Sequence, residues 1–204
     1  MAKNYDLSWI MRKNHYVNRL LKEKKEGMVD EDIVPLLELI NSLNAYYTTS
    51  SCSGRIQIAE TEIPGEKGVM RMVAKWHRPI TAEELKATVE ASEARNLWLG
   101  VQPPILHIMC RSIDDALKML VIARGSGFKR AGIQGIKEGR CPVEIVGTER
   151  IEMPLILDGK LIVKYEKYPL LVEKVNRVLL KSKERIKRLE NALKQRFNVN
   201  SATL

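Results

Sequence analysis

The last part of the chain carries the strongest periodic pattern in the sequence and most restricts the fold. Between Pro169 and Phe197, apolar residues recur at mostly three-to-four spacing, which predicts one long helix with an apolar face. The residues on this face are Leu171, Val175, Val178, Ile186, Leu189 and Leu193. Because tertiary packing of such a face supplies most of a helix's stability, we expect this helix to pack on the rest of the chain or on a partner subunit.

The same helix has a second, basic stripe at the same period. Its members are Lys174, Arg177, Lys181, Arg185 and Arg188. From Lys160 onward the chain has twelve Lys and Arg against four Glu, so this part has a net charge of +8 out of +9 for the whole chain. This concentration favours a nucleic-acid partner, because Lys and Arg that neutralise phosphates release counterions. A solvated helix surface, as in heat-adapted proteins rich in Lys and Glu, is the alternative.

The preceding residues mix strand and helix patterns without strict alternation. Amphipathic spacing predicts helices over Ser8 to Lys25, Ile33 to Leu43 and Ala116 to Arg124, and a further helix after a Thr81 cap. Alternating patterns predict strands over Arg55 to Glu60, Val69 to Trp76, Trp98 to Val101, Ile105 to Cys110, Ala131 to Ile136, Val143 to Thr148, Arg150 to Pro154 and Lys160 to Val163. We therefore expect an α+β fold with a mixed, largely antiparallel sheet and flanking helices.

This pattern also predicts a domain organisation. We expect residues 1–168 to form a single α+β catalytic domain whose residues 1–44 are helical, followed by a basic C-terminal helix over residues 169–204. A weak internal similarity suggests a duplication. Met72 to Arg78 is a strand with a His and basic residues followed by an acid-capped helix, and Ile105 to Arg111 repeats this order. In both, positive side chains and helix amides can converge on an anion.

Several classes of protein are not supported. No run approaches the roughly 18 to 20 apolar residues of a membrane span, and the N-terminus lacks a signal-peptide core, which predicts a cytoplasmic protein. The cysteines, Cys52, Cys110 and Cys141, show no C-x-x-C spacing, so we expect free thiols and no metal site. The glycines around Phe128 do not form G-x-G-x-x-G after a strand, so a Rossmann-type loop is not predicted.

A stretch rich in uncharged polar groups runs from Tyr46 to Arg55. Its hydroxyls, thiol and guanidinium are suited to a polar small molecule or an oxyanion, and Gly54 can adopt a positive φ. An ordinary serine-rich turn before a strand is the alternative. Cys52 is also a candidate nucleophile if an imidazole activates it, which leaves a thiol-dependent enzyme open.

Two histidines lie at similar strand positions. His77 and His107 each have basic neighbours, so they are candidates for proton transfer, although strand histidines are often structural. Trp76 and Trp98 are candidates for stacking on a base or for the core.

Five segments together resemble the tRNA wybutosine-synthesising methyltransferase family in its archaeal form. They are Ser50 to Arg55, Lys75 to His77, Ile105 to His107, Gly127 to Ile133 and Thr148 to Leu155. The resemblance implies a methyltransferase fold unlike the Rossmann type. It also implies transfer of a methyl group from S-adenosylmethionine to the N-4 nitrogen of a tricyclic demethylwyosine-type guanosine beside the anticodon of phenylalanine tRNA.

With this resemblance, the candidate residues are assigned places in a methyl-transfer site. Ser51, Cys52, Ser53, Gly54 and Arg55 are predicted to hold the donor, and His77, His107 and Ser53 are the predicted catalytic residues. Predicted RNA or substrate contacts are Lys75, Trp76, Arg78, Arg111, Lys129, Arg130, Lys174, Arg177 and Lys181. Ala131 departs from the small polar residue expected there. A non-catalytic tRNA-binding module remains an alternative that explains the charge and the aromatic residues.

Overall fold

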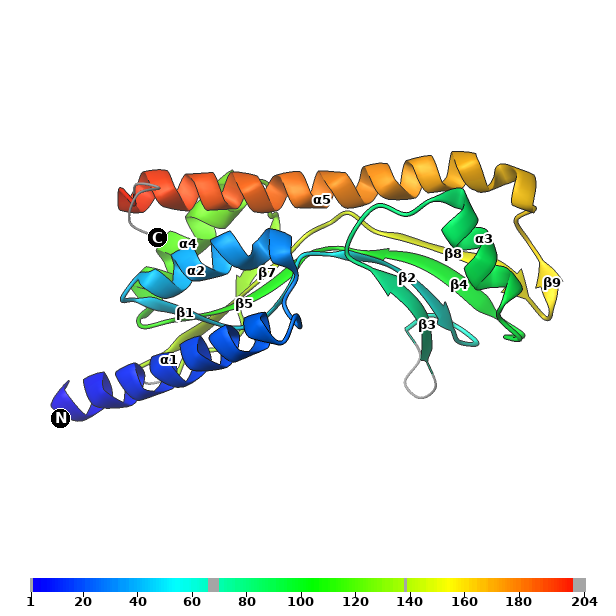
Figure 1. Ribbon diagram of the computed structural model, residues 1–204. Helices are drawn as coiled ribbons and strands as arrows, with labels where there is room; N and C mark the ends of the chain where they lie inside the picture. Colours follow the sequence, from blue (N-terminus) through cyan, green and yellow to red (C-terminus); the bar gives the residue numbers. More distant parts are fainter. Residues whose placement is uncertain (1, 66–69, 138, 200–204) are drawn as a thin grey trace. The chain divides into compact units, whose positions relative to one another are not determined.

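The structure is a computed structural model that describes residues 2–65, 70–137 and 139–199. The chain divides into two compact units, each with its own sheet and hydrophobic core (Figure 1). The first unit comprises Met1–Ser53, Pro104–Thr148 and Lys183–Leu204, and the second comprises Gly54–Pro103 and Glu149–Ser182. Both units are therefore assembled from segments that are distant in the sequence.

The first unit contains a four-stranded antiparallel sheet in the order β1-β5-β7-β6. The strands are β1 (Tyr46–Cys52), β5 (Ile105–Cys110), β6 (Arg130–Ile133) and β7 (Cys141–Val146). The helices are α1 (Ala2–Lys25), a short 3-10 turn (Glu31–Ile33), α2 (Val34–Ser42), α4 (Ile113–Gly125) and the part of α5 (Tyr168–Phe197) that starts at Lys183.

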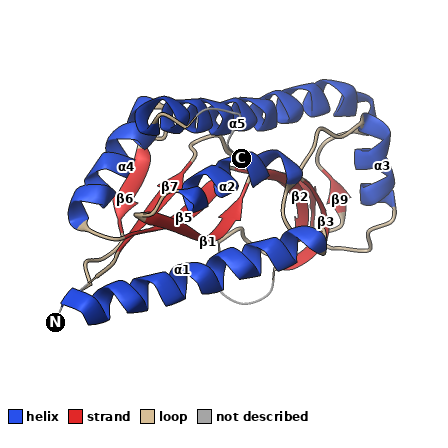
Figure 2. Ribbon diagram, turned by 60° about the vertical axis from the view of Figure 1, so that its left-hand side comes forward, coloured by secondary structure: helices blue, strands red, loops and turns tan. Residues whose placement is uncertain are grey.

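Opposite faces of this sheet are covered by different helices. On one face, α2, α4 and the second half of α5 bury a core that includes Tyr46 of β1. Tyr47 points to the other face, where its ring stacks on Tyr16 of α1 with 5.3 Å between centroids and lies 4.9 Å from the ring of Trp9. Figures 1 and 2 accordingly show α1 on the side of β1 opposite α2 and α4. The alternation of side chains along a strand thus gives each tyrosine a different helix as its partner.

The polar stretch that begins at Tyr46 is a strand as far as Cys52, and the interpretation of it as a turn is wrong for this part. Its side chains alternate between the two faces of the sheet except at one irregularity between Thr48 and Ser50, and β5 supplies the backbone hydrogen bonds. Asn41 of α2 fixes the strand at Thr48 by two reciprocal hydrogen bonds of 2.9 Å. The chain turns only afterwards, where Gly54 has the positive φ that its sequence context predicts, +91°.

The second unit contains a five-stranded antiparallel sheet in the order β3-β2-β4-β8-β9. The strands are β2 (Arg55–Glu60), β3 (Arg71–Trp76), β4 (Leu97–Gln102), β8 (Ile151–Leu157) and β9 (Lys160–Leu161), and Val69 of the predicted strand lies outside the described residues. The helices are α3 (Ala82–Glu90), a 3-10 turn (Tyr165–Lys167) and α5 up to Ser182. α3 and this part of α5 pack on one face of the sheet.

Short-range hydrogen bonds and backbone conformations fix two boundaries in the second unit, and the first is the predicted Thr81 cap. Thr81 and Glu84 form a capping box at the start of α3, in which each side chain bonds to the backbone of the other residue. Asp158 and Gly159 both have positive φ in the two-residue turn between β8 and β9.

The two units share one arrangement of strands and a helix. In the first, β5 and β6 flank β7 and are joined through α4; in the second, β3 and β4 flank β2 and are joined through α3. In each case the two flanking strands are parallel to one another, because both are antiparallel to the strand between them. The similarity noticed between Met72–Arg78 and Ile105–Arg111 corresponds to the strand and helix that open this arrangement.

The structure confirms the predicted fold class, α+β with antiparallel sheets and no Rossmann fold, although there are two sheets where one was expected. The predicted boundary between residues 168 and 169 falls at the start of α5, and the extent of the predicted domain stays a prediction. None of the helices in residues 2–65, 70–137 and 139–199 is long and apolar enough to cross a membrane.

Candidate functional site

A hydroxyl, an imidazole and a carboxylate lie side by side on the α1 face of the first sheet. Ser50 Oγ is 2.8 Å from His107 Nδ1, and His107 Nε2 is 3.0 Å from Glu144 Oε2. Gln134 Nε2 donates to the other carboxylate oxygen of Glu144 at 3.2 Å. The three side chains come from β1, β5 and β7, on which Ser50 is paired with His107 and His107 with Glu144. Cross-strand register therefore assembles this group.

A bulge in β1 brings Ser50 to this face. The register of β1 against β5 shifts between Thr48 and Ser50, so Thr48 is opposite Ile108 and Ser50 is opposite His107. Thr49 is the extra residue. Without it, strict alternation from Thr48, which faces α2, would direct Ser50 toward the helix-covered core.

The hydrogen bonds of His107 determine which of its ring nitrogens carries the hydrogen and which can accept a proton. An ionised carboxylate accepts hydrogen bonds only, so with neutral imidazole Nε2 carries the hydrogen that Glu144 accepts. Nδ1 is then the acceptor for the hydroxyl of Ser50. His107 and Glu144 remain partly exposed, with 38% and 31% of their side-chain surfaces accessible. The group is therefore oriented for proton uptake at Nδ1 and is open to a substrate.

Ser53 lies in a different environment, at the end of the polar stretch. Its side chain is fully buried, and its Oγ is 2.5 Å from Nζ of Lys183 on α5. The backbone N–H of Ser53 donates to Asp30 at 2.8 Å, and Lys183 also pairs with Asp32 at 2.6 Å. The hydroxyl of Ser53 thus accepts a hydrogen bond from a largely buried ammonium group, which fixes the turn before Gly54.

Lys183 gives a direct test of this turn. Replacing it in Lys183→Met keeps most of the side-chain volume but leaves the Ser53 hydroxyl without its partner. We expect the free energy of unfolding to fall by about 1–3 kcal/mol, the cost of an unsatisfied buried polar group. Urea denaturation would measure it. Lys187→Met, at an exposed position of the same helix, is the matched control; equal stability of both variants would contradict the role given to Lys183.

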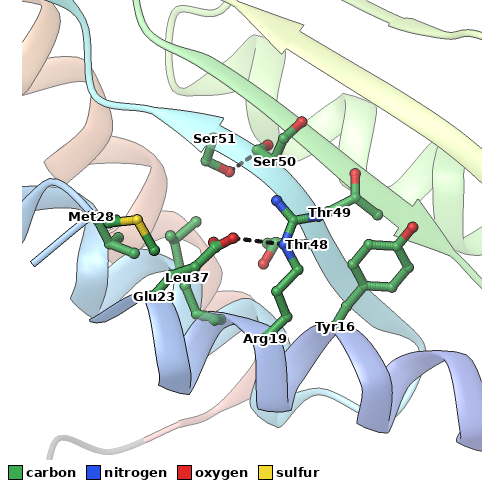
Figure 3. A pocket seen from close by; sticks show the side chains of 11 residues that line it. Tyr16, Arg19, Glu23, Met28, Leu37, Thr48, Thr49, Ser50 and Ser51 are labelled. Carbon is green, nitrogen blue, oxygen red and sulfur yellow. Dashed lines mark hydrogen bonds and ion pairs between the residues drawn. The ribbon is translucent and has the colours of Figure 1, made fainter. Parts of the chain in front are cut away.

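The predicted donor-binding residues do not all share one environment. The Ser51 hydroxyl donates to the backbone oxygen of Ser50 at 2.7 Å, and the side chain faces a small cavity of about 60 Å³ between α1 and β1 (Figure 3). This cavity also contacts Arg19, whose guanidinium pairs with Glu23 at 2.7 Å. It has room for water but not for a nucleoside.

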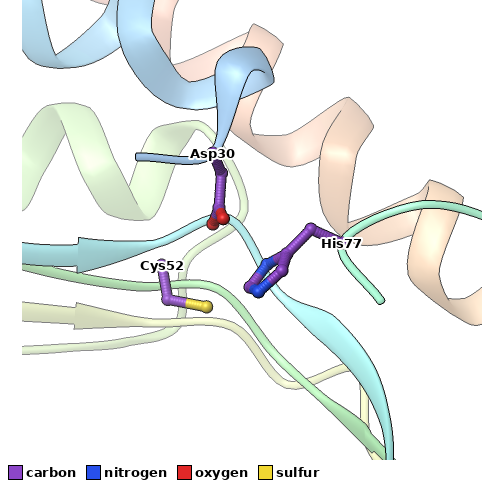
Figure 4. A group of neighbouring side chains, drawn as sticks. All are labelled: Asp30, Cys52 and His77. Atoms are coloured by element: carbon purple, nitrogen blue, oxygen red, sulfur yellow. The ribbon is translucent and has the colours of Figure 1, made fainter. Parts of the chain in front are cut away.

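Cys52 and the predicted catalytic His77 belong to different units. Cys52 ends β1 of the first unit, and its thiol is half-buried; Figure 4 also draws Asp30 of the same unit, which holds the Ser53 amide. His77 follows β3 in the second unit. The other two thiols, Cys110 and Cys141, are buried in the first core, and this burial raises the pKa of both.

Arg55 opens β2 and lines a pocket of about 240 Å³ on the face of the second sheet opposite its helices. The residues that line this pocket also include Gln57, Trp98, Gly100, Gln102, Arg150 and Glu152. Arg55 Nε donates to Gln57 Oε1 at 2.9 Å. Among the predicted donor-binding residues, Arg55 thus lines a pocket that is larger than the cavity beside Ser51.

The predicted RNA contacts differ in how they are held. Arg78 makes two hydrogen bonds to Glu84 at the start of α3, and Arg111 pairs with Asp6 of α1. Trp76 is paired with Ile56 and packs against the second core, whereas Trp98 is on the pocket face. The remaining predicted contacts are exposed, namely Lys75, Lys129, Arg130, Lys174, Arg177 and Lys181.

Three residues that make the hydrogen bonds described above were not among the site residues predicted from the sequence. Glu144 is the polar residue of an otherwise apolar alternation in β7, and this signal is visible in the sequence. Ser50 was noticed only as part of the polar stretch, because its face depends on the bulge. Lys183 belongs to the general basic composition of α5, and no local pattern marks it as buried.

The chain is similar to known proteins over most of its length. The family model described as Methyltransferase TYW3 matches residues 11–195. The chain belongs to this family. A family member from Thermococcus sibiricus is 37% identical over 95% of this chain and 96% of its own length, and one from Pyrococcus furiosus is 42% identical over 86% and 85%. Both are named tRNA(Phe) 7-((3-amino-3-carboxypropyl)-4-demethylwyosine(37)-N(4))-methyltransferase, the second with the number 2.

Solved structures agree with this family membership. The PH1069 protein of Pyrococcus horikoshii is 35% identical, with a TM-score of 0.86 over 93% of this chain and 97% of that one. A hypothetical protein from Aeropyrum pernix is 31% identical, with a TM-score of 0.73 over 81% and 98%. The resemblance drawn from the sequence motifs is thus confirmed.

Proposed function

We propose that this protein transfers a methyl group from S-adenosylmethionine to the N-4 nitrogen of the demethylwyosine-type tricycle next to the anticodon of phenylalanine tRNA. The observation that carries the proposal is the activity in the names of relatives that are 37 to 42% identical over most of both chains. The basic, largely exposed residues of α5 suit a tRNA substrate, and the cytoplasm is where we place the reaction.

The residues around Arg55 fit the chemistry of the methyl donor. S-adenosylmethionine, when bound, supplies a methyl group on a positively charged sulfur. The pocket offers the guanidinium groups of Arg55 and Arg150 for a carboxylate, the Trp98 indole for a heterocycle and the amides of Gln57 and Gln102 for polar edges. The cavity of about 60 Å³ beside Ser51 is too small for a nucleoside. We therefore assign donor binding to Arg55 and its pocket, with Ser53 and Lys183 positioning the adjoining turn.

His107 is the residue to which we assign proton transfer. Transfer of the methyl group to a ring nitrogen that bears a hydrogen would break the methyl–sulfur bond of the donor, form an N–C bond, and release S-adenosylhomocysteine and one proton. His107 Nδ1 is the acceptor for this proton, directly or through the Ser50 hydroxyl, which accepts one proton as it passes its own to Nδ1. Glu144 holds the ring by its bond to Nε2 and stabilises the imidazolium that forms. Glu144 is therefore a positioning residue.

The activity is tested by incubating the purified protein with S-adenosylmethionine and phenylalanine tRNA that carries the unmethylated tricycle. Nucleoside mass spectrometry should find a gain of one methyl group on the tricycle. No gain from tRNA that is nevertheless bound would overturn the proposal in favour of a non-catalytic binding module. A Cys52→Ala variant should retain the activity, since the proposed proton transfer does not use the thiol; its complete loss would favour a thiol-dependent enzyme.

The basic stripe of α5 gives a separate test of RNA binding. Neutralising Lys174, Arg177 and Lys181 together, each to Gln, should weaken tRNA binding and flatten its salt dependence. Three lost phosphate contacts correspond to a slope smaller by roughly 2 to 3 in a plot of log K against log salt. The matched control neutralises Arg12, Lys22 and Lys25, which are exposed on α1. If both triple variants lose the same affinity, general charge and not this stripe determines binding.

A further inference from the structure

The pocket on the open face of the second sheet contains a built-in pair of opposite charges. Arg150 Nη2 lies 3.0 Å from Glu152 Oε2, and both side chains line the pocket of about 240 Å³. The guanidinium is 53% and the carboxylate 31% accessible, so both can reach a ligand. An exposed pair of this kind contributes only about 0–1 kcal/mol to stability, which leaves its place in a pocket without a structural explanation.

The floor of the pocket is shaped by cross-strand register. Gln57, Gly100 and Glu152 form one row across β2, β4 and β8. Arg55 and Gln102 form the next row, and Trp98 is opposite Ala59 on the other side. Gly100 thus lies at the centre of the pocket, where there is no side chain. Around it are the Trp98 indole, the amides of Gln57 and Gln102, and the Arg150–Glu152 pair.

Gly100 is important because the side-chain amides converge above it. A Cβ at this position would lie 3.3 Å from Nε2 of Gln102, 3.3 Å from Cγ of Gln57 and 3.6 Å from Nε2 of Gln57. Any larger side chain would fill the space between the amides. Glycine therefore leaves an opening in which a flat ring can approach the backbone, with hydrogen-bonding groups at its edges.

We propose that this pocket binds an α-amino acid zwitterion attached by a short chain to a flat heterocycle, with Arg150 on its carboxylate and Glu152 on its ammonium. Each ligand charge then replaces one partner of the Arg150–Glu152 pair, so no charge is left unpaired on binding. Trp98 and the amides contact the heterocycle. This inference rests on the proposed function. Two reactants of that function, the methyl donor and the tricycle in the names of the relatives, each carry a 3-amino-3-carboxypropyl group, which is such a zwitterion on a short chain.

Binding experiments with two pairs of probes distinguish whether the zwitterion in the pocket belongs to the methyl donor or to the tricycle. The first pair is S-adenosylhomocysteine and 5′-methylthioadenosine, which differ by the zwitterion. The second pair is phenylalanine tRNA whose tricycle has or lacks the aminocarboxypropyl chain. We expect the wild-type protein to prefer the zwitterionic member of one pair by about 10- to 100-fold, the range for charged hydrogen bonds. Arg150→Gln and Glu152→Gln should each remove most of this preference.

Arg95→Gln is the matched control, because Arg95 forms an exposed pair with Asp158 at 2.8 Å in the same unit but does not line this pocket. Loss of the preference within the first pair of probes supports the assignment of the pocket to the donor, and loss within the second replaces that assignment by the tricycle. If Arg150→Gln discriminates within both pairs as the wild type does, or if the wild type discriminates in neither, the inference is overturned. Methyl transfer by the wild-type enzyme, measured in parallel, tests the proposed function independently.

Discussion

A His107→Ala variant is expected to lose most of its methyl-transfer rate while its affinity for tRNA stays close to that of the wild type. The imidazole is the acceptor at the centre of the Ser50–His107–Glu144 group, and alanine has no group that can accept the proton. Loss of a positioned general base lowers kcat by roughly 10²- to 10⁴-fold. Single-turnover methylation with saturating tRNA measures the chemical step without product release.

The control for this variant is His15→Ala, which removes an exposed histidine on α1 and should leave kcat unchanged. Glu144→Gln should give a smaller loss in kcat with KM unchanged, because the amide can still accept a bond from His107 but has no charge to stabilise the imidazolium. A fully active His107→Ala enzyme would rule out the assigned proton transfer. A parallel loss of tRNA affinity would instead indicate a binding role.

Truncation after Tyr168 is expected to prevent folding of both units. Apolar side chains of α5 enter both cores: Val172, Val175 and Leu179 in the second, and Ile186, Leu189 and Leu193 in the first. Burial of one such side chain contributes roughly 1.5–3 kcal/mol, whereas a whole domain is stable by only about 5–15 kcal/mol. Loss of three such side chains from each core therefore removes about 4.5–9 kcal/mol, which is comparable to the whole stability of a domain. Circular dichroism should show no cooperative thermal transition for the truncated chain.

The control is a chain that ends at Val199, which retains α5 and should melt as the full-length protein does. A truncated chain that still melts cooperatively at nearly the wild-type temperature would show that α5 is an appendage. The role of α5 in RNA binding is therefore tested by neutralising its exposed basic residues and not by deletion, because deletion would remove the fold together with the charge.

The structure of the polar stretch from Tyr46 to Arg55 could not be predicted from its residue types alone. The residue types predicted a ligand-binding loop or a turn, and the structure makes most of the stretch a strand. The hydroxyl of Ser53 is buried against Lys183, which is 130 positions away in the sequence. Ser50 meets His107 only because of one extra residue in β1. Contacts of this kind depend on register and on distant partners, and neither is encoded in a short window of sequence.

The sequence by itself determined the family and most of the elements, with β1 as an exception. Helical period, the Thr81–Glu84 capping box and the Asp158–Gly159 turn are short-range features, because their hydrogen bonds and φ preferences involve residues close in the chain. The family motifs are equally local. Only the tertiary structure decided that β1 pairs with β5 while β2 pairs with β3 and β4, and that α5 contributes to two cores. These choices depend on apolar surfaces and ladders formed over the whole chain at once, because each strand competes for several partners.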